Sequence, residues 1–250
     1  MGKFDGLLIC SDMDGTLFWR RQISRENREA ISYFRENGGA FTVASGRDPY
    51  WLMKTIGKDF FQTPMICVNG GILFDPIEEK ILFRGTMPEG YRAMTREALS
   101  WRGMREVVLF PIEMTEKCIY TPGMGDELDE ALRVDQIKVV YHVDDEVSDE
   151  YKRVIRDRLG SEFSVARSWK NGIEVFGASY EKGRSCRKIA DMIGADTLIC
   201  VGDYENDLSM IREADIGVAV ANAIPEVLAA ADRVTASAEE HGIAELIYRL

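Results

Sequence analysis

Short apolar runs, each closed at once by small or polar residues, alternate with helical segments in the first third of this chain. The apolar runs are 7–10, 40–44 and 65–68, and the helical segments between them lie at about 25–36 and 49–56. A short run that is apolar throughout is typical of a strand covered on both faces of its sheet. Strands and helices in alternation predict a parallel sheet joined by right-handed crossovers.

The last third of the chain repeats this pattern, whereas the middle does not. Apolar runs at 197–201 and 216–220 each follow a helical segment, as in the first third. In the middle, the expected strands follow one another through short connections, which indicates an α+β unit with antiparallel pairing. We therefore predict an α/β protein with a doubly wound, Rossmann-like parallel-sheet core made of residues 1–83 and 179–250. An inserted α/β (α+β) domain is expected at 84–178.

Charge and cysteine content narrow the class of function. The 250 residues include 31 basic and 42 acidic side chains, which gives a formal net charge of −11. Unaided binding to nucleic acid or to an anionic membrane needs basic patches, so we expect neither partner. The five cysteines are scattered without a CxxC pair, which favours reduced thiols and a cytoplasmic protein. No apolar stretch reaches the roughly 18 residues of a membrane-spanning helix.

Polar side chains gather where the apolar runs end. Asp12 and Asp14 follow the first run, Ser45-Gly46-Arg47 the second, and Gly202-Asp203 the run at 197–201. The carboxyl ends of parallel strands meet at one edge of a sheet, where ligands bind in open α/β folds. Carboxylates crowded there repel one another unless a cation holds them. Oxygen ligands without His or Cys favour a hard ion such as Mg²⁺, and Asp12 and Asp203 are the natural pair.

The same residue types suit chemistry on a phosphate group. A metal beside Asp12 would reduce its repulsion of an incoming phosphate and allow nucleophilic attack, and aspartyl-phosphate formation is an established form of covalent catalysis. Ser45 and the backbone N–H groups beside it, including that of Gly46, can bind phosphate oxygens. Lys182, just before an expected helix, can place a cation against the transferred group. Spacing alone does not separate the roles of Asp12 and Asp14.

Four motifs in order carry a resemblance to a known family. The segment Asp12-Met13-Asp14-Gly15-Thr16-Leu17 resembles the first motif of the haloacid dehalogenase superfamily of phosphohydrolases. Ser45 in Ala-Ser-Gly-Arg resembles the second motif, Lys182 the third, and Gly202-Asp203-Tyr-Glu-Asn206-Asp207 the fourth. The large insertion between Ser45 and Lys182 is similar to that of the Cof-type (type IIB) subgroup, whose C2 cap lies at that point. The resemblance spans essentially the whole chain.

This resemblance implies a role for each motif residue. Asp12 would be the nucleophile, and Asp14 would protonate the leaving oxygen and then activate water. The Asp12 carboxylate, the Asp14 backbone carbonyl and Asp203 would hold Mg²⁺. The phosphate would be bound by Ser45, Gly46, Lys182 and Asn206. Asp207 would orient the site from behind these residues, and direct contact between Asp207 and the metal stays open as an alternative.

Less specific interpretations stay open for several other residues. Ser45 could simply cap a helix, and Arg47 could pair with a nearby acid instead of substrate. Asn69, which follows the third apolar run, is more readily explained as part of a tight turn than as a substrate contact. Trp19 could pack beneath the cap or line an entrance. Within the inserted domain, residues 170–174 are candidates for substrate specificity.

The sequence thus predicts a Mg²⁺-dependent phosphatase that hydrolyses a small phosphorylated metabolite, such as a sugar phosphate, through an aspartyl-phosphate. One alternative is phosphoryl transfer between two positions of a sugar, as in a mutase. Another is a phosphometabolite-binding protein of the same fold without catalytic activity. A binding protein needs no acid at Asp14, so that residue favours turnover. No feature of the sequence indicates an oligomeric state.

Overall fold

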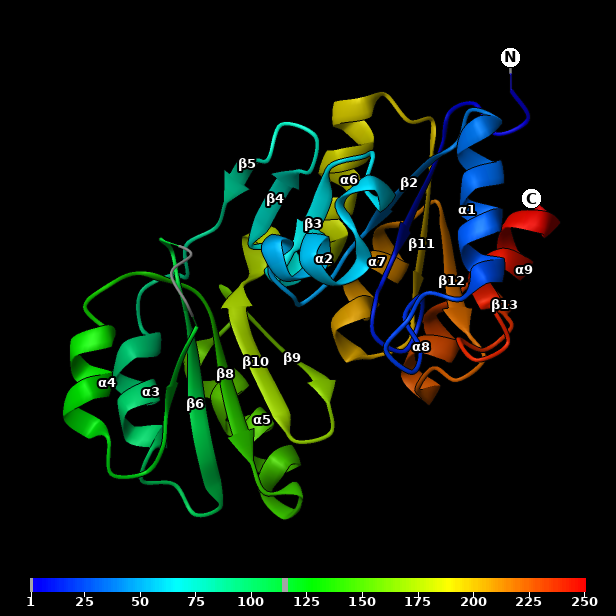
Figure 1. The fold of residues 1–250 in the computed structure, drawn as a ribbon. Coiled ribbons are helices and arrows are strands. Elements are labelled where there is room, and N and C mark those ends of the chain that lie inside the picture. The colour runs from blue at the N-terminus through cyan, green and yellow to red at the C-terminus, as the bar shows by residue number, and fades with distance from the viewer. Residues whose placement is uncertain (1, 114–116) are drawn as a thin grey trace. The chain divides into compact units, whose positions relative to one another are not determined.

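A computed structural model describes residues 2–113 and 117–250 of the chain. The chain forms two compact units (Figure 1): residues Met1–Phe83 together with Lys182–Leu250, and residues Arg84–Glu181. No helix in the described ranges is both long and apolar enough to cross a bilayer.

The first unit is built on a parallel sheet with strand order β13-β12-β11-β1-β2. Its strands are β1 (Leu7–Ser11), β2 (Ala40–Val43), β11 (Thr197–Gly202), β12 (Ile216–Val220) and β13 (Arg233–Thr235). Every neighbouring pair is parallel. The register places Ser11 beside Val201, so the chain leaves β1 and β11 at the same edge of the sheet.

Helices cover both faces of this parallel sheet. They are α1 (Arg25–Glu36), α2 (Pro49–Ile56), α6 (Lys182–Ile193), α7 (Leu208–Glu213), α8 (Pro225–Ala230) and α9 (Gly242–Arg249). Alternate side chains of β1, Leu8 and Cys10, pack in one core cluster with Ile189 of α6 and Met210 of α7. Helices α1 and α9 pack together on the opposite face (Figure 1). The predicted doubly wound parallel core is confirmed.

One predicted strand pairs differently from expectation. Strand β3 (Met65–Cys67) belongs to a separate three-stranded sheet with β4 (Ile72–Asp75) and β5 (Lys80–Arg84). It meets the edge of the parallel sheet through a single bridge between Ala44 and Ile66. The chain turns back after Cys67 through the 3₁₀ turn Val68–Gly70, so β3 pairs antiparallel with β4. Another 3₁₀ turn, Lys58–Phe60, precedes β3.

The second unit is an antiparallel sheet with helices packed on it. The strands β6 (Met104–Pro111), β7 (Cys118–Tyr120), β8 (Gln136–Val143), β9 (Phe163–Trp169) and β10 (Gly172–Gly177) lie in the order β7-β6-β8-β10-β9. The helices are α3 (Tyr91–Ala98), α4 (Gly125–Ala131) and α5 (Asp145–Leu159). Their apolar faces and one face of the sheet form a single core. The expected separate antiparallel insert is therefore present.

A buried ion pair lies on the other side of the strands of the second unit. Lys138 Nζ lies 2.7 Å from Glu174 Oε1, and each side chain is 2% exposed. The second oxygen of Glu174 accepts a hydrogen bond from Ser168 Oγ at 2.5 Å. Of the proposed specificity segment 170–174, Glu174 is thus engaged within its own sheet.

Candidate active site

Asp12 and Lys182 form the centre of the site. Asp12 follows β1 directly, and its backbone N–H donates to the carbonyl of Val201 at 2.8 Å, which continues the pairing with β11. Lys182 opens α6 and is fully buried. Its Nζ donates to Asp12 Oδ1 at 2.5 Å and to Asp207 Oδ1 at 2.7 Å. A single ammonium group thus joins the first, third and fourth motifs.

Asp207 is held in place by three N–H donors. In addition to Lys182, the backbone N–H groups of Asp203 and Tyr204 donate to Asp207 Oδ2 at 2.9 Å and 3.1 Å. The Asp207 side chain is fully buried. Because both of its oxygens already accept hydrogen bonds, Asp207 is suited to orient Lys182 and the turn after β11. This arrangement suits the orienting role, and Asp207 is also one of three carboxylates that lie close enough together to hold a metal ion.

Asp203 lies at the end of β11 beside the loop of the first motif. Its Oδ1 accepts a hydrogen bond from Thr16 Oγ1 at 2.7 Å, and Thr16 is fully buried. Gly15 has φ +89°, and a Cβ atom there would lie 2.6 Å from Asp203 Oδ2. Glycine is therefore required at position 15, both for the left-handed backbone and for the close approach of Asp203. The sequence places Thr16 within the first motif, but no role was assigned to it there.

The charges of this cluster are unbalanced. Burial, reinforced by the charge of Asp207, raises the pKa of Asp12 well above its usual range, although Lys182 opposes the shift. Burial and the same neighbouring charge raise the pKa of Asp203 to about 7. Burial works against the charge of Lys182, but Asp12 and Asp207 outweigh it and raise the lysine pKa. Lys182 alone therefore does not keep Asp12 and Asp203 in their charged forms.

The donor set fits a hard metal ion. Asp12, Asp203 and Asp207 each offer a carboxylate oxygen, and these oxygens lie within 4.8 Å of one another. All three residues are buried, and only oxygen atoms are offered, as divalent cations such as Mg²⁺ prefer. A bound cation would supply the positive charge that the buried carboxylates still need.

Asp14 lies apart from the buried cluster. Its side chain is 49% exposed and forms a two-point ion pair with Arg47, with distances of 2.7 Å and 2.8 Å. The Arg47 guanidinium group stacks 3.8 Å from the ring centroid of Trp51. Arg47 thus pairs with an acid in this structure, as one of the two interpretations of the sequence expects.

The second motif and Asn206 are joined through Asn69. The Asn69 backbone N–H donates to the Ser45 carbonyl at 2.9 Å, and its side-chain oxygen accepts from Asn206 Nδ2 at 3.4 Å. Ser45 is buried, and its Oγ accepts from the Arg47 N–H at 3.2 Å. The N-cap of α2 is Asp48, so the interpretation of Ser45 as a simple helix cap is wrong. Asn69 lies in the 3₁₀ turn Val68–Gly70, as the sequence indicates, and is buried between Ser45 and Asn206.

Comparison with known proteins agrees with this geometry. A family model described as haloacid dehalogenase-like hydrolase matches residues 9–99 and 118–247, so the chain belongs to that family. A phosphatase of Bacillus subtilis, YwtE, described as a 5-amino-6-(5-phospho-D-ribitylamino)uracil phosphatase, is 29% identical, covering 97% of each chain. The pyridoxal phosphate phosphatase YbhA of Escherichia coli is 24% identical, over 96% of this chain and 97% of YbhA.

A solved structure shares the fold of nearly the whole chain. The solved structure of the subclass IIB sugar phosphatase BT4131 matches with a TM-score of 0.83 at 22% identity, covering 97% of this chain and 98% of that one. The family match and the full-length phosphatase relatives identify the chain as a haloacid dehalogenase-like phosphatase, and its fold is that of the subclass IIB structure. The predicted class of enzyme, a haloacid dehalogenase-type phosphatase, is confirmed.

Replacement of Lys182 tests how much the fold depends on its charge. We expect Lys182→Met to lower the free energy of unfolding by about 3–5 kcal/mol, because Asp12 and Asp207 would lose their buried cation. Urea denaturation in the presence of a chelator measures this loss. Arg184→Met, an exposed position on the same helix, is the matched control and should be nearly neutral. Equal stability of the two variants would show that the buried ion pairs do not support the fold.

Proposed function

We propose that this protein is a Mg²⁺-dependent phosphatase that hydrolyses a small phosphorylated metabolite through an aspartyl-phosphate at Asp12. The observation that carries the proposal is the buried cluster in which Lys182 contacts both Asp12 and Asp207 beside Asp203. A nucleophilic carboxylate needs a nearby cation to accept a dianionic phosphate, and in this cluster Lys182 contacts Asp12 directly.

The proposed reaction has two displacements at phosphorus. An oxygen of the Asp12 carboxylate attacks, the ester bond to the leaving oxygen breaks, and Asp14 gives that oxygen a proton. Water then attacks the phosphorus of the aspartyl-phosphate, Asp14 takes a proton from the water, and inorganic phosphate leaves with Asp12 restored. The Asp14 carboxylate is ion-paired with Arg47 in this structure, so in this proposal it exchanges Arg47 for the leaving oxygen and then for water.

The remaining residues would bind and orient. Lys182, the Ser45 hydroxyl, the Gly46 N–H and the Asn206 amide are suited to phosphate oxygens, and Asp207 keeps Lys182 in place. The carboxylates of Asp12 and Asp203 and the backbone carbonyl of Asp14 would hold Mg²⁺. When bound, this ion offsets the charge shared by the carboxylates and the phosphate.

The chemistry of the site and the names of the relatives support a proposal for the substrate class. YwtE and YbhA carry the names of two different phosphate esters, and BT4131 is described as a sugar phosphatase. One fold and one set of motifs therefore accommodate several leaving groups. We propose a sugar phosphate or a related small phosphomonoester for this chain.

Release of inorganic phosphate tests the proposed chemistry. With Mg²⁺ and a panel of phosphorylated metabolites, we expect turnover that Asp12→Asn abolishes, because an amide is not a nucleophile at phosphorus. Asp14→Asn should lower kcat by about 10²–10⁴-fold, the usual size of acid–base catalysis. Asp191→Asn, an exposed acid on α6, is the control and should keep full activity.

The outcomes of this assay separate the alternatives. An isomerised phosphosugar in place of free phosphate would support the mutase. Tight ligand binding without turnover on any member of the panel would support the binding protein. Full activity in Asp12→Asn would contradict the proposed nucleophile.

Stabilisation by Mg²⁺ tests the metal site independently of substrate. A ligand that binds only the folded state at about 100 times its Kd adds about 2.7 kcal/mol to the free energy of unfolding. We expect Mg²⁺ to raise the melting temperature accordingly, and Asp203→Asn to remove most of this rise by taking away a charged oxygen ligand. The same control, Asp191→Asn, should respond like the original chain. An undiminished response in Asp203→Asn would place the metal elsewhere.

A further inference from the structure

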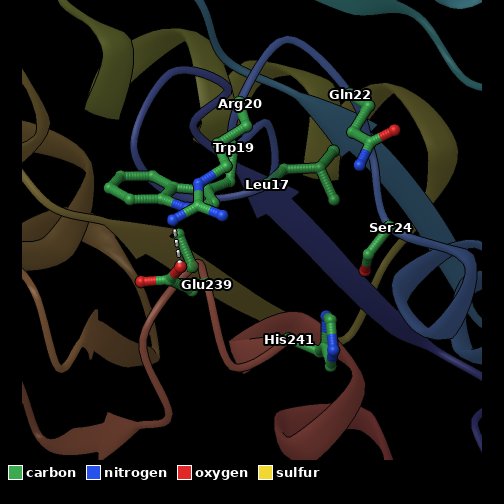
Figure 2. A pocket seen from close by; sticks show the side chains of 8 residues that line it. Leu17, Trp19, Arg20, Gln22, Ser24, Glu239 and His241 are labelled. Atoms are coloured by element: carbon green, nitrogen blue, oxygen red, sulfur yellow. Dashed lines mark ion pairs between the residues drawn. The ribbon is translucent and has the colours of Figure 1, made fainter.

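A cavity lies within the first unit, outside the cluster of Asp12, Asp203, Asp207 and Lys182. It has a volume of about 190 Å³ and is bounded by two segments, residues 17–24 and residues 238–241. Figure 2 shows Trp19, Arg20 and Gln22 from the first segment facing Glu239 and His241 from the second. No residue of the carboxylate cluster is among those described as lining it.

One side of the cavity carries two opposite charges. Arg20 Nη2 lies 2.7 Å from Glu239 Oε1, and the two side chains are 74% and 53% exposed (Figure 2). An ion pair this exposed contributes little to stability, so exchanging partners with a ligand costs little. Leu17 and Ala238 contribute buried apolar surface to the same cavity. The cavity therefore combines a cation, an anion and an apolar wall.

His241 leaves a buried polar atom without a partner. Its Nδ1 atom is buried and forms no hydrogen bond with any described residue. On the other side of the ring, Nε2 lies 3.7 Å from Glu26 Oε2. A buried ring nitrogen without a hydrogen bond is costly.

The backbone around the cavity is strained. Trp19 and Gln22 exchange backbone hydrogen bonds of 3.0 Å and 3.1 Å across a tight turn. The two central residues of that turn, Arg20 and Arg21, have φ of 48° and 66°, which is the geometry that hairpins normally assign to Gly or Asn. His241 has φ 64°. Backbone strain of this kind is common at ligand-binding sites. Two of the strained residues, Arg20 and His241, line the cavity.

Hydrogen bonds connect the cavity to the loop of the first motif. The Ala238 N–H donates to Asn222 Oδ1 at 2.7 Å, and Asn222 Nδ2 donates to the Gly15 carbonyl at 2.8 Å. The next residue, Thr16, donates to Asp203. Residue 238 is therefore linked by hydrogen bonds to the loop that holds Asp203.

We propose that this cavity binds a small zwitterion of the α-amino acid class. The carboxylate of the ligand would pair with Arg20 and its ammonium group with Glu239, while its side chain would contact Leu17 and Ala238. A cavity of about 190 Å³ is smaller than the roughly 300–1,000 Å³ of sites for drug-sized ligands, which suits a compound of this size. This site is separate from the proposed phosphatase chemistry, and its occupancy does not depend on that chemistry.

Calorimetric titration of the full chain with the common α-amino acids tests the proposal. For each amino acid that binds, the amine lacking its carboxylate and the acid lacking its amino group are titrated as matched probes. We expect binding of the zwitterion and at least roughly 10-fold weaker binding of both truncated compounds, because each loses one charge-assisted hydrogen bond. Slower hydrogen exchange in residues 13–18 on binding would support the connection through Asn222.

Variants of the two charged residues locate the bound ligand. Arg20→Gln and Glu239→Gln should each weaken binding by about 10- to 100-fold. Arg25→Gln removes another exposed ion pair, with Glu29, that does not line the cavity, and it should leave the affinity unchanged. The proposal is overturned if no amino acid binds up to about 10 mM, a limit that corresponds to negligible affinity. Equal binding of either truncated probe, or unchanged affinity in Arg20→Gln, would also overturn it.

Discussion

The contacts of Lys182 with Asp12 and Asp207 are the interaction on which the rest of the site depends. A cation in the first turn of a helix is opposed by the helix dipole, and burial of its charge costs several kcal/mol. The two carboxylates outweigh the cost of burial, since they raise the lysine pKa. Through these two contacts, Lys182 holds the start of α6 beside the residues that follow β1 and β11. One lysine does not balance the charge of three buried acids. A divalent metal would offset the remaining negative charge.

The parallel sheet explains why these distant residues meet. Strands β1 and β11 are neighbours in register, with Ser11 beside Val201, so the residues that follow them leave the sheet together. Asp12 continues the pairing by one hydrogen bond to Val201, and Asp203 lies next to the loop through Thr16. Asp207 then closes the turn on the backbone N–H groups of Asp203 and Tyr204. The acids are close because strand ends in a parallel sheet are close. Their burial raises the pKa of Asp12 and of Asp203, so the charged forms need a nearby cation.

Reasoning from sequence anticipated the residues at strand ends better than those in loops. Asp12, Asp203 and Lys182 follow or precede regular elements, so the periodicity of the chain places them. Thr16 and Asn69 lie in loops. There the sequence does not distinguish a buried residue that forms hydrogen bonds from an ordinary turn residue. The pairing of β3 with β4 depends on the turn after Cys67, which an apolar run does not encode. The ion pair of Asp14 with Arg47 similarly depends on how two loops approach each other, and the sequence left it open.

The claim that Asp12 becomes phosphorylated can be tested directly by chemical trapping. Borohydride reduces an acyl phosphate to an alcohol, so treatment of the enzyme quenched during turnover should convert the side chain at position 12 to that of homoserine. Peptide mass spectrometry would detect the change at this position, in samples given substrate and Mg²⁺ and not in samples without substrate. Reduction at residue 12 that depends on substrate is the expected result. Phosphate release that proceeds at full rate with no trapped product at Asp12 would contradict the account.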